Sequence, residues 1–370
     1  MASACQNAKG SRSSLPTSAA EGDPRSDEMS GGGGLLSVRH PHPLDGLVEF
    51  EEEGHKYTHN PSGRRVPKSQ TAATGPYFDT FKPDETIEKY YKGWRTNPDS
   101  KYWALIHYKE LAELADGADI KKAIQLLWKL NGERAAADGT KMHKQLEDYL
   151  NGLMPDPLTQ PTPPMGVALY LGMMQWFYPE QELEPWRVEF SVCVEVEMFE
   201  FKDKRRKTAK YPAICGNIDA IFRSKRDGRF WILDWKRVDP KKKGLLGRMV
   251  MELGGGHGKR KARDPDMASG PFHRWEATAY NKYSAQLHGY RWQLIEGGYM
   301  EPEQIAGCFL VQMHEDMQKA HVIEAADMAD EVDGVMRAEV KAAKKAYIEE
   351  QLAQDEGVVE CDVTWSIKCD

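Results

Sequence analysis

Three charged residues interrupt two segments that otherwise have the pattern of strands. Residues 214–223 and 230–236 alternate apolar and polar side chains around a short Asp-Gly turn, which predicts two antiparallel strands. Asp219 lies in the first segment, and Asp234 and Lys236 end the second. Strands are poor in Asp, and a buried charge is costly unless it is paired or bound to a metal. Because Asp234 and Lys236 are two residues apart, their side chains leave the strand on the same side, and we expect both to converge with Asp219.

Two carboxylates beside a lysine suit the metal-assisted hydrolysis of a phosphodiester. Carboxylate oxygens are ligands for hard cations such as Mg²⁺ or Mn²⁺, which polarise a phosphate and lower the pKa of water. The lysine can orient or deprotonate the attacking water and offset charge in the transition state. Taken alone, however, the three residues fit an ordinary hairpin with solvated ion pairs better, so the rest of the chain has to decide.

The neighbouring segments predict the elements that must position these residues. Residues 186–199 and 305–313 have strand patterns, and apolar residues at helical spacing predict helices at 120–128, 139–152, 167–178, 275–297 and 325–354. We therefore predict an α/β fold. Its mixed central sheet is built from strands near 186–199, 212–223, 229–236 and 305–313, and the helices at 139–152 and 275–297 flank it.

Composition divides the chain into four parts. Residues 1–44 are rich in Ser, Gly, Ala and Pro and predict a disordered tail. Residues 45–135 predict an extension of small strands and helices packed on the core, residues 136–323 the core itself, and residues 324–370 a C-terminal helix and tail with a short strand near 358–367. The first twenty residues lack acids, as transit peptides do, but show no amphipathic Arg-rich helix.

The composition of the whole chain limits the classes of function. A net charge of −7 argues against a protein that coats nucleic acid nonspecifically, although a local basic groove remains compatible with it. No apolar run is close in length to the about 18–20 residues that a membrane-spanning helix needs, so we expect no membrane partner. The six cysteines include no CxxC pair, which argues against a zinc site and favours reduced thiols inside the cell. The nucleus or cytoplasm is the favoured location of the protein, and the mitochondrion is a further alternative.

Basic residues border the two strands that carry the acids. One run precedes the first strand and another follows the second. Both could bind phosphate groups of a nucleic acid favourably, and the alternative is that they are solvated loops. The candidate nucleic-acid-binding residues are Lys204, Arg205, Arg206, Lys207, Arg237, Lys241, Lys242 and Lys243.

Four motifs occur in a fixed order along residues 139–315. They are Gly139-x-x-x-His143-x-x-x-Glu147, Gly216-x-x-Asp219, Asp234-x-Lys236 and Gln286-x-x-x-Tyr290. In this order, and on a helix, two strands and a helix, they resemble the motifs of the PD-(D/E)XK nuclease superfamily, in its RecB-like exonuclease branch. The segment 54–81 is similar to nuclease-like proteins of large DNA viruses and protists, and the motifs are also similar to those of the mitochondrial genome maintenance exonuclease.

The resemblance implies a role for each motif residue. Asp219, Asp234 and the main-chain carbonyl of Trp235 would hold Mg²⁺ or Mn²⁺, and His143 would complete the ligand set and bias it toward Mn²⁺. Lys236 would position or activate the attacking water.

The remaining candidates would act around this centre. Gln286 and Tyr290 would orient the water or hold the phosphates of the scissile strand. Glu147 would orient His143 or Lys236, with a plain surface glutamate as the alternative. Glu189, near the start of its strand, either faces the site or faces solvent.

The implied fold is a restriction-endonuclease-like core, and the implied activity is metal-dependent hydrolysis of DNA that leaves a 5′-phosphate and a 3′-hydroxyl. An exonuclease acting on single strands or duplex ends, in DNA repair, replication or recombination, is favoured over a sequence-specific endonuclease. Some members of the branch hold an iron–sulfur cluster, but Cys308, Cys361 and Cys369 are too widely spaced for one. A helicase or other repair partner would be a separate polypeptide, and the oligomeric state stays open. The alternatives are an inactive nucleic-acid-binding protein with the same fold and an RNA-directed nuclease.

Overall fold

A five-stranded mixed sheet forms the centre of the computed structural model, which describes residues 35–51, 54, 56–78, 81–108, 120–155, 159, 163–202, 205–240 and 266–354. The strand order is β4-β5-β6-β7-β8, with β6 and β7 parallel and the other neighbours antiparallel. The strands are β4 (Leu183–Lys202), β5 (Arg205–Ser224), β6 (Phe230–Arg237), β7 (Ile305–Met313) and β8 (His321–Glu324). The predicted α/β class and the four predicted strands are confirmed, whereas β8 was not predicted.

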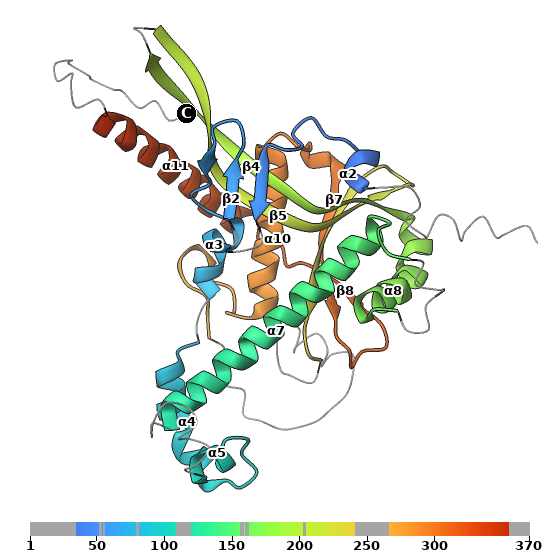
Figure 1. Ribbon diagram of the computed structural model, residues 1–370, viewed down its shortest axis with the longest axis vertical. Helices are drawn as coiled ribbons and strands as arrows, with labels where there is room; N and C mark the ends of the chain where they lie inside the picture. Colours follow the sequence, from blue (N-terminus) through green and yellow to red (C-terminus); the bar gives the residue numbers. More distant parts are fainter. Residues whose placement is uncertain are drawn as a thin grey trace, which may run out of the picture.

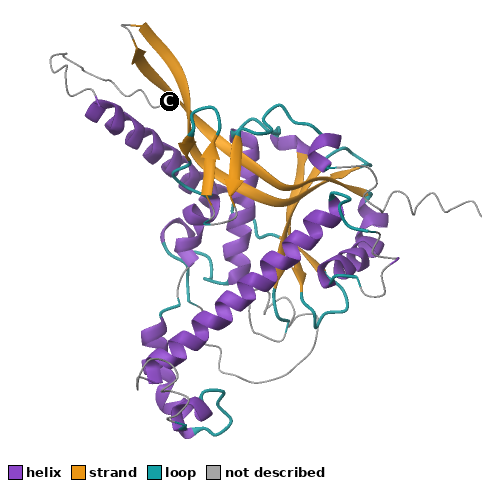
Figure 2. Cartoon of the chain, in the orientation of Figure 1, coloured by secondary structure: helices purple, strands orange, loops and turns teal. Residues whose placement is uncertain are grey.

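Helices cover both faces of this sheet (Figures 1 and 2). On one face, α7 (Ile120–Leu150) and α8 (Met165–Gln181) pack against apolar side chains of β5, β6 and β7, including Phe222 and Trp235. On the other face, α10 (Ala279–Glu296) packs against Ile218, Ile232 and Leu310. The central part of the sheet is therefore buried on both sides. This explains why β6 and β7 contain runs of consecutive buried residues, whereas a strict alternation was expected for residues 230–236.

Helix α7 is longer than the sequence predicted. The segments 120–128 and 139–152 were expected as separate helices, but they belong to one helix of 31 residues. Its first part, with α4 (Pro83–Thr96) and α5 (Trp103–His107), forms a small lobe at the lower end of the molecule (Figure 1). Ile87, Ile106 and Ile124 form the core of that lobe.

The strands β4 and β5 form a long hairpin that projects beyond the rest of the sheet (Figure 1). The basic run that was predicted to bind phosphate, with a solvated loop as the alternative, lies at the tip of this hairpin. The register there pairs Lys202 with Arg205 and Phe201 with Arg206. The C-terminal helix α11 (Ala329–Gln354) packs along the hairpin, and Tyr347 donates a hydrogen bond to the carbonyl of Pro212 at 2.6 Å. The strand predicted near 358–367 lies outside the described residues.

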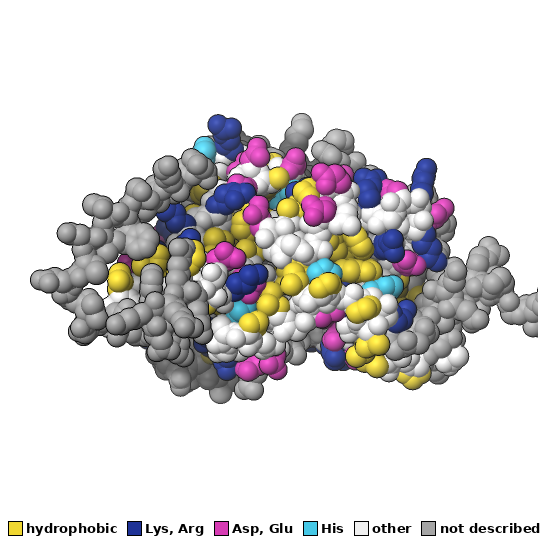
Figure 3. Space-filling model, turned by 90° about the horizontal axis from the view of Figure 1, so that it is seen from above, with side chains coloured by type: hydrophobic (Ala, Val, Ile, Leu, Met, Phe, Trp, Pro, Cys, Tyr) yellow, Lys and Arg dark blue, Asp and Glu magenta, His cyan; other side chains and the backbone are white. Residues whose placement is uncertain are grey.

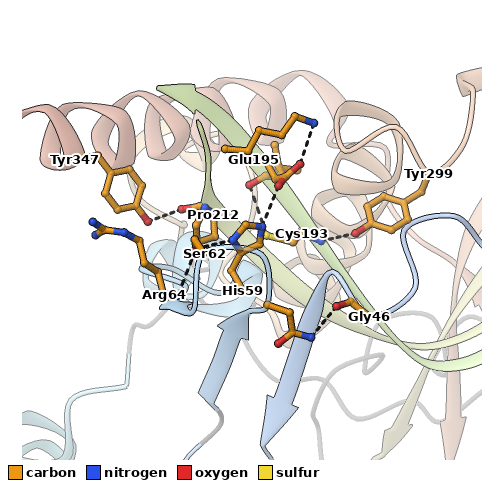
Figure 4. Close-up of polar contacts among 12 residues, drawn as sticks. Gly46, His59, Ser62, Arg64, Cys193, Glu195, Pro212, Tyr299 and Tyr347 are labelled. Atoms are coloured by element: carbon orange, nitrogen blue, oxygen red, sulfur yellow. Dashed lines mark hydrogen bonds and ion pairs between the residues drawn. The ribbon is translucent and has the colours of Figure 1, made fainter. Parts of the chain in front are cut away.

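A second, three-stranded antiparallel sheet contains β1 (Val48–Glu51), β2 (Lys56–His59) and β3 (Arg64–Arg65). His59, at the end of β2, is fully buried and bridges Ser62 and Glu195 of β4, at 2.7 and 2.9 Å (Figure 4). The short helix α3 (Gln70–Thr74) and the 3₁₀ turn η1 (Gly75–Phe78) follow this sheet and lie against α10, and the short 3₁₀ turns η3 (Gly270–Phe272) and η4 (Pro302–Gln304) flank that helix in sequence.

Part of the segment that was predicted to be a disordered tail has a defined structure. Helix α2 (Leu36–Arg39) lies within the segment expected to be a disordered tail, and Leu36 is buried in the core beside α7 and α8. The main-chain N–H of Leu36 donates to Asn151 Oδ1 at 3.0 Å, which fixes this segment in place. The boundary at residue 44 is therefore too late, and residues 1–34 lie outside the described part. Among the described helices, none combines the length and the apolar composition needed to cross a membrane.

Candidate active site

Asp219 lies where β5 and β6 separate. The ladder between these strands ends at the pair Ala220–Leu233. Beyond it, Asp219 Oδ2 accepts a hydrogen bond from the main-chain N–H of Trp235 at 2.8 Å. The carboxylate thus replaces a main-chain ladder partner, and this bond fixes it at the point where the strands diverge.

Asp234 and Lys236 form a close ion pair on β6. Lys236 Nζ lies 2.6 Å from Asp234 Oδ2, and Asp234 is fully buried. Asp234 Oδ1 accepts no hydrogen bond from a described donor, and the Asp234 side chain also interacts with that of Asp219. The two carboxylates and Lys236 therefore form one charged cluster.

The local electrostatics reflect this burial. Burial raises the pKa of Asp234 to about 7; Lys236 opposes that shift and Asp219 adds to it. Burial alone would lower the pKa of Lys236, but the charges of Asp234 and Asp219 outweigh it, and the pKa of Lys236 is raised. The lysine is therefore held in its ammonium form.

His143 approaches the acids from α7. Its Nε2 lies 2.8 Å from the carbonyl oxygen of Trp235, and its Nδ1 faces Asp219 Oδ2 at 3.6 Å and Glu189 Oε1 at 3.9 Å. Ligand atoms of His143, Glu189 and Asp219 all lie within 4.8 Å of one another. One imidazole nitrogen and two carboxylates therefore surround a single point.

Glu189 reaches this point through an unusual main-chain conformation. Its φ is 45°, in the left-handed region that few residues other than glycine adopt. Asn217 of β5 donates a hydrogen bond to Glu189 Oε2, and Ser191 donates to Asn217 Oδ1 at 2.9 Å. Of the two alternatives left open for Glu189, the side chain faces the site.

Helix α10 contributes the fourth motif from the other face of the sheet. Gln286 Nε2 donates to the hydroxyl of Tyr290 at 2.8 Å. Tyr290 is buried against Gly216, where an added Cβ would meet its ring at 2.7 Å. Burial raises the pKa of Tyr290, and the nearby charges of Asp219 and Asp234 add to the shift.

Some predicted residues lie elsewhere. Glu147 forms its ion pair with Lys144 at 2.9 Å rather than with His143 or Lys236. Arg237 points to Asp138, at 3.3 Å, and to Glu315.

The basic residues of the hairpin that the structure describes lie far from the site along the strand. Arg205, Arg206 and Lys207 lie at the tip of the hairpin, and Asp219 is 14 residues further along β5 than Arg205. At 3.2–3.4 Å per residue in a strand, this corresponds to roughly 45 Å. Lys204 and Lys241 to Lys243 lie outside the described residues. On the upper face of the molecule in Figure 1, basic and acidic side chains are interspersed (Figure 3).

Two residues of the site were missed by the sequence reasoning. The ring of Tyr283 lies 4.5 Å from Lys236 Nζ, and Asn217 holds Glu189 as described above. Tyr283 precedes Gln286 by three positions, so helical spacing placed the two on one side of α10, although nothing in the sequence paired Tyr283 with Lys236. A second group with ligand-like geometry, Asp239, His314 and Asp316, lies just beyond the ends of β6 and β7.

His143, Glu189 and Asp219 could together hold a metal ion. If His143 Nε2 donates its hydrogen to the Trp235 carbonyl, the lone pair of Nδ1 faces Asp219 and Glu189. Asp234, which was also expected to be a ligand, lies outside this three-residue group.

Comparison with known proteins adds no family assignment. No family model matches the sequence, and no curated protein matches it. One solved structure, described as "Crystal structure of SSO0001", is similar at a TM-score of 0.22 and 13% sequence identity, over 56% of this chain and 70% of that chain. A likeness at that TM-score carries no argument about fold or function.

Proposed function

We propose that this chain is a metal-dependent nuclease with a PD-(D/E)XK, RecB-like core that hydrolyses the phosphodiester bonds of DNA. One observation carries the proposal: His143, Asp219, Asp234 and Lys236 lie together although they come from one helix and two strands. His143 faces Asp219, Asp219 interacts with Asp234, and Asp234 forms a buried ion pair with Lys236. The motif order and the resemblance described above supply the choice of substrate.

His143, Asp219 and Asp234 would hold Mg²⁺ or Mn²⁺, with Glu189 as a further ligand from β4. When bound, the cation supplies Lewis acidity toward the scissile phosphate. The ammonium group of Lys236, anchored beside Asp234, orients the attacking water and offsets negative charge that develops in the transition state.

Gln286 and Tyr290 would contact the substrate from α10. Their side chains hydrogen-bond to each other and leave the amide oxygen of Gln286 as an acceptor for water. Action on ends or single strands, in DNA repair, replication or recombination, is preferred over sequence-specific cutting because no segment resembles a base-reading module. A separate helicase or replication partner fits this assignment.

The test is degradation of end-labelled linear single-stranded DNA, linear duplex DNA and closed circles. Each substrate is incubated with Mg²⁺, with Mn²⁺ and with EDTA, for the natural chain and for Lys236→Ala. We expect loss of linear substrate only, a requirement for metal, and loss of at least about 100-fold in rate for Lys236→Ala, since one electrostatic group is worth 10²–10³ in rate.

The other outcomes each identify an alternative. Cleavage of closed circles would make the chain an endonuclease, and faster cleavage of RNA of the same sequence would make it an RNA-directed nuclease. DNA binding without cleavage under all metal conditions would refute the catalytic assignment and leave a binding protein. Lys236→Gln, which keeps an unbranched start and a polar end but is uncharged and one atom shorter, distinguishes loss of the charge from loss of most of the side chain.

A further inference from the structure

Two buried cysteines lie directly opposite each other on neighbouring strands. Cys193 of β4 is the register partner of Cys215 of β5. The N–H of Cys215 donates to the carbonyl of Lys68 at 3.1 Å, and the N–H of Cys193 donates to the hydroxyl of Tyr299 at 3.0 Å. Both N–H groups therefore point away from the partner strand, which identifies a non-hydrogen-bonded pair of an antiparallel ladder.

This type of pair has the geometry of a disulfide. Its Cα atoms are about 4.5 Å apart and its side chains leave the same face of the sheet, within the range of about 4.4–6.8 Å found for bridged cysteines. Both thiols are free and belong to one apolar cluster with Val48 and Val66. We propose that Cys193 and Cys215 form a two-thiol modification site, which a peroxide or a small disulfide converts into a cross-strand disulfide between β4 and β5. The proposal does not depend on nuclease activity.

The chemistry balances with a two-electron oxidant. With hydrogen peroxide, one thiolate attacks a peroxide oxygen and becomes a sulfenic acid, and the second thiol then displaces water from it. The sum is two thiols and one peroxide giving one disulfide and two waters. With oxidised glutathione, a mixed disulfide forms first and the second cysteine releases the other glutathione as a thiol.

The small N-terminal sheet covers this pair and sets its reactivity. Val48 of β1 and Val66, next to β3, pack over the thiols, while His59 holds β2 to Glu195, two residues from Cys193 (Figure 4). Burial raises the pKa of Cys193 to about 12, and the pKa of Cys215 is raised as well, again chiefly by burial. Since the thiolate is the reactive form, oxidation is slow while the cover is closed and accelerates as the pH rises.

Cys308 of β7 provides a matched comparison within the same molecule. It is also buried, and burial raises the pKa of its thiol to about 12. Its Sγ contacts the carbonyl of Leu287, and its register partner on β6 is Ile232 rather than a cysteine. Cys308 thus shares the burial of the pair but lacks an opposing thiol.

The experiment uses the full chain with Cys5, Cys361 and Cys369 changed to Ser, beside the natural chain. The folded protein is exposed to hydrogen peroxide and, separately, to oxidised glutathione. It is then unfolded, alkylated and mapped by peptide mass spectrometry without reductant. We expect a linked Cys193–Cys215 peptide, a fall in alkylatable thiols from three to one, unchanged alkylation of Cys308, and full reversal by dithiothreitol.

The proposal fails if Cys193 and Cys215 stay as alkylatable as Cys308 throughout exposure to both oxidants. It also fails if they yield only separate sulfinic acids or mixed glutathione adducts. In the Cys215→Ser variant, Cys193 should remain unlinked; a Cys193–Cys308 bridge there would show that oxidation occurs in unfolded molecules, and the assignment to the folded strand pair would be withdrawn.

Discussion

Lys236 is held on two sides, by the carboxylate of Asp234 and by the ring of Tyr283. A cation over an aromatic face gains about 0.5–2 kcal/mol, depending on how far it is desolvated. Under the proposed function, Tyr283→Leu should lower kcat by about 3- to 10-fold with little change in KM. The substitution displaces the catalytic lysine but leaves the residues that bind the substrate in place. Tyr283→Phe keeps the ring and should stay within about twofold of the natural chain. Equal activity of the two variants, measured on end-labelled single-stranded DNA, would exclude this role.

Glu189 combines a strained main chain with a place among the candidate metal ligands. A residue other than glycine in the left-handed region costs about 1–3 kcal/mol. Glu189→Gly should therefore raise the free energy of unfolding in EDTA by about 1 kcal/mol while weakening Mn²⁺ binding about tenfold. Glu189→Gln keeps the main-chain strain but loses the charge. It should therefore weaken Mn²⁺ binding without raising the free energy of unfolding. Urea unfolding and titration calorimetry measure the two quantities; a Glu189→Gly variant that binds Mn²⁺ like the natural chain would remove Glu189 from the ligand set.

At this scale, period-two spacing was enough to place Asp234 and Lys236 on one side of a strand, and the structure joins them in an ion pair. The partner of the Glu147 side chain could not be predicted in the same way. The helical spacing of Glu147 from His143 was correct, but whether a glutamate turns inward or pairs with Lys144 depends on the rotation of α7 against the sheet. Tyr283 was missed because its partner lies on another element, 47 residues away.

Among the elements, α7 shows that apolar periodicity alone does not predict the full length of a helix. Its buried residues occur in two groups, near Ile124 and from Met142 to Leu150, because the first packs in the small lobe and the second on the sheet. The exposed stretch between them, which contains Gly132 and Gly139, has no apolar periodicity and therefore gave two predicted helices. Each glycine costs a helix only about 1 kcal/mol, which packing at both ends outweighs.

The β4–β5 hairpin deviates from prediction for a related reason. Residues 205–210 are mostly charged and have no apolar alternation. Their backbones nevertheless pair with residues 197–202 of β4 in continuous register. Strand formation depends on pairing and neighbours more than on intrinsic preference, so a single sequence could not distinguish this hairpin tip from a loop.

Contact between β5 and α10 requires a glycine at position 216. A Cβ on Gly216 would lie 2.7 Å from the Tyr290 ring and 2.8 Å from Gln293 Oε1. Gly216→Ala should therefore lower the free energy of unfolding by about 1–3 kcal/mol, as overpacking does, and should displace Tyr290 from the site.

The control is Gly132→Ala in α7, where nothing lies within 4 Å of the added Cβ. There the helix preference for Ala should raise the free energy of unfolding by about 0.5–1 kcal/mol. Denaturant titration of both variants tests whether the free energy of unfolding falls for Gly216→Ala and rises for Gly132→Ala. If Gly216→Ala were as stable as the natural chain, the close approach of α10 to β5 would not be required.

For the whole molecule, the site depends on the complete fold. His143 comes from a helix on one face of the sheet, Tyr283, Gln286 and Tyr290 from the helix on the other, and the acids from three strands between them. No single element and no pair of adjacent elements contains all of these groups. This explains why the motifs are spread over residues 139–315 and why each is uninformative by itself.

The N-terminal sheet is attached to this core through a small number of contacts, among which His59 is the most buried. Its ring nitrogens lie 2.7 Å from Ser62 Oγ and 2.9 Å from Glu195 Oε1. Removing one partner of a buried hydrogen bond costs about 1–3 kcal/mol, so His59→Ala should lower the free energy of unfolding by about 2 kcal/mol. His273→Ala, at an exposed position whose hydrogen bonds among the described residues are to the Gly270 carbonyl, should change it by less than about 0.5 kcal/mol.

The same variant distinguishes a local opening from a general loss of stability. If the sheet β1–β3 is a separate cover, His59→Ala should raise the rate of native-state alkylation of Cys193 and Cys215, which lie beneath it, by at least about tenfold, because a free-energy change of 1.4 kcal/mol is a factor of ten in an opening equilibrium. Cys308, buried on β7 and covered by α10 instead, should react at its original rate under the same conditions. A proportional rise at all three cysteines would mean that the molecule opens as one unit, and the N-terminal sheet would then be part of the core rather than a cover over it.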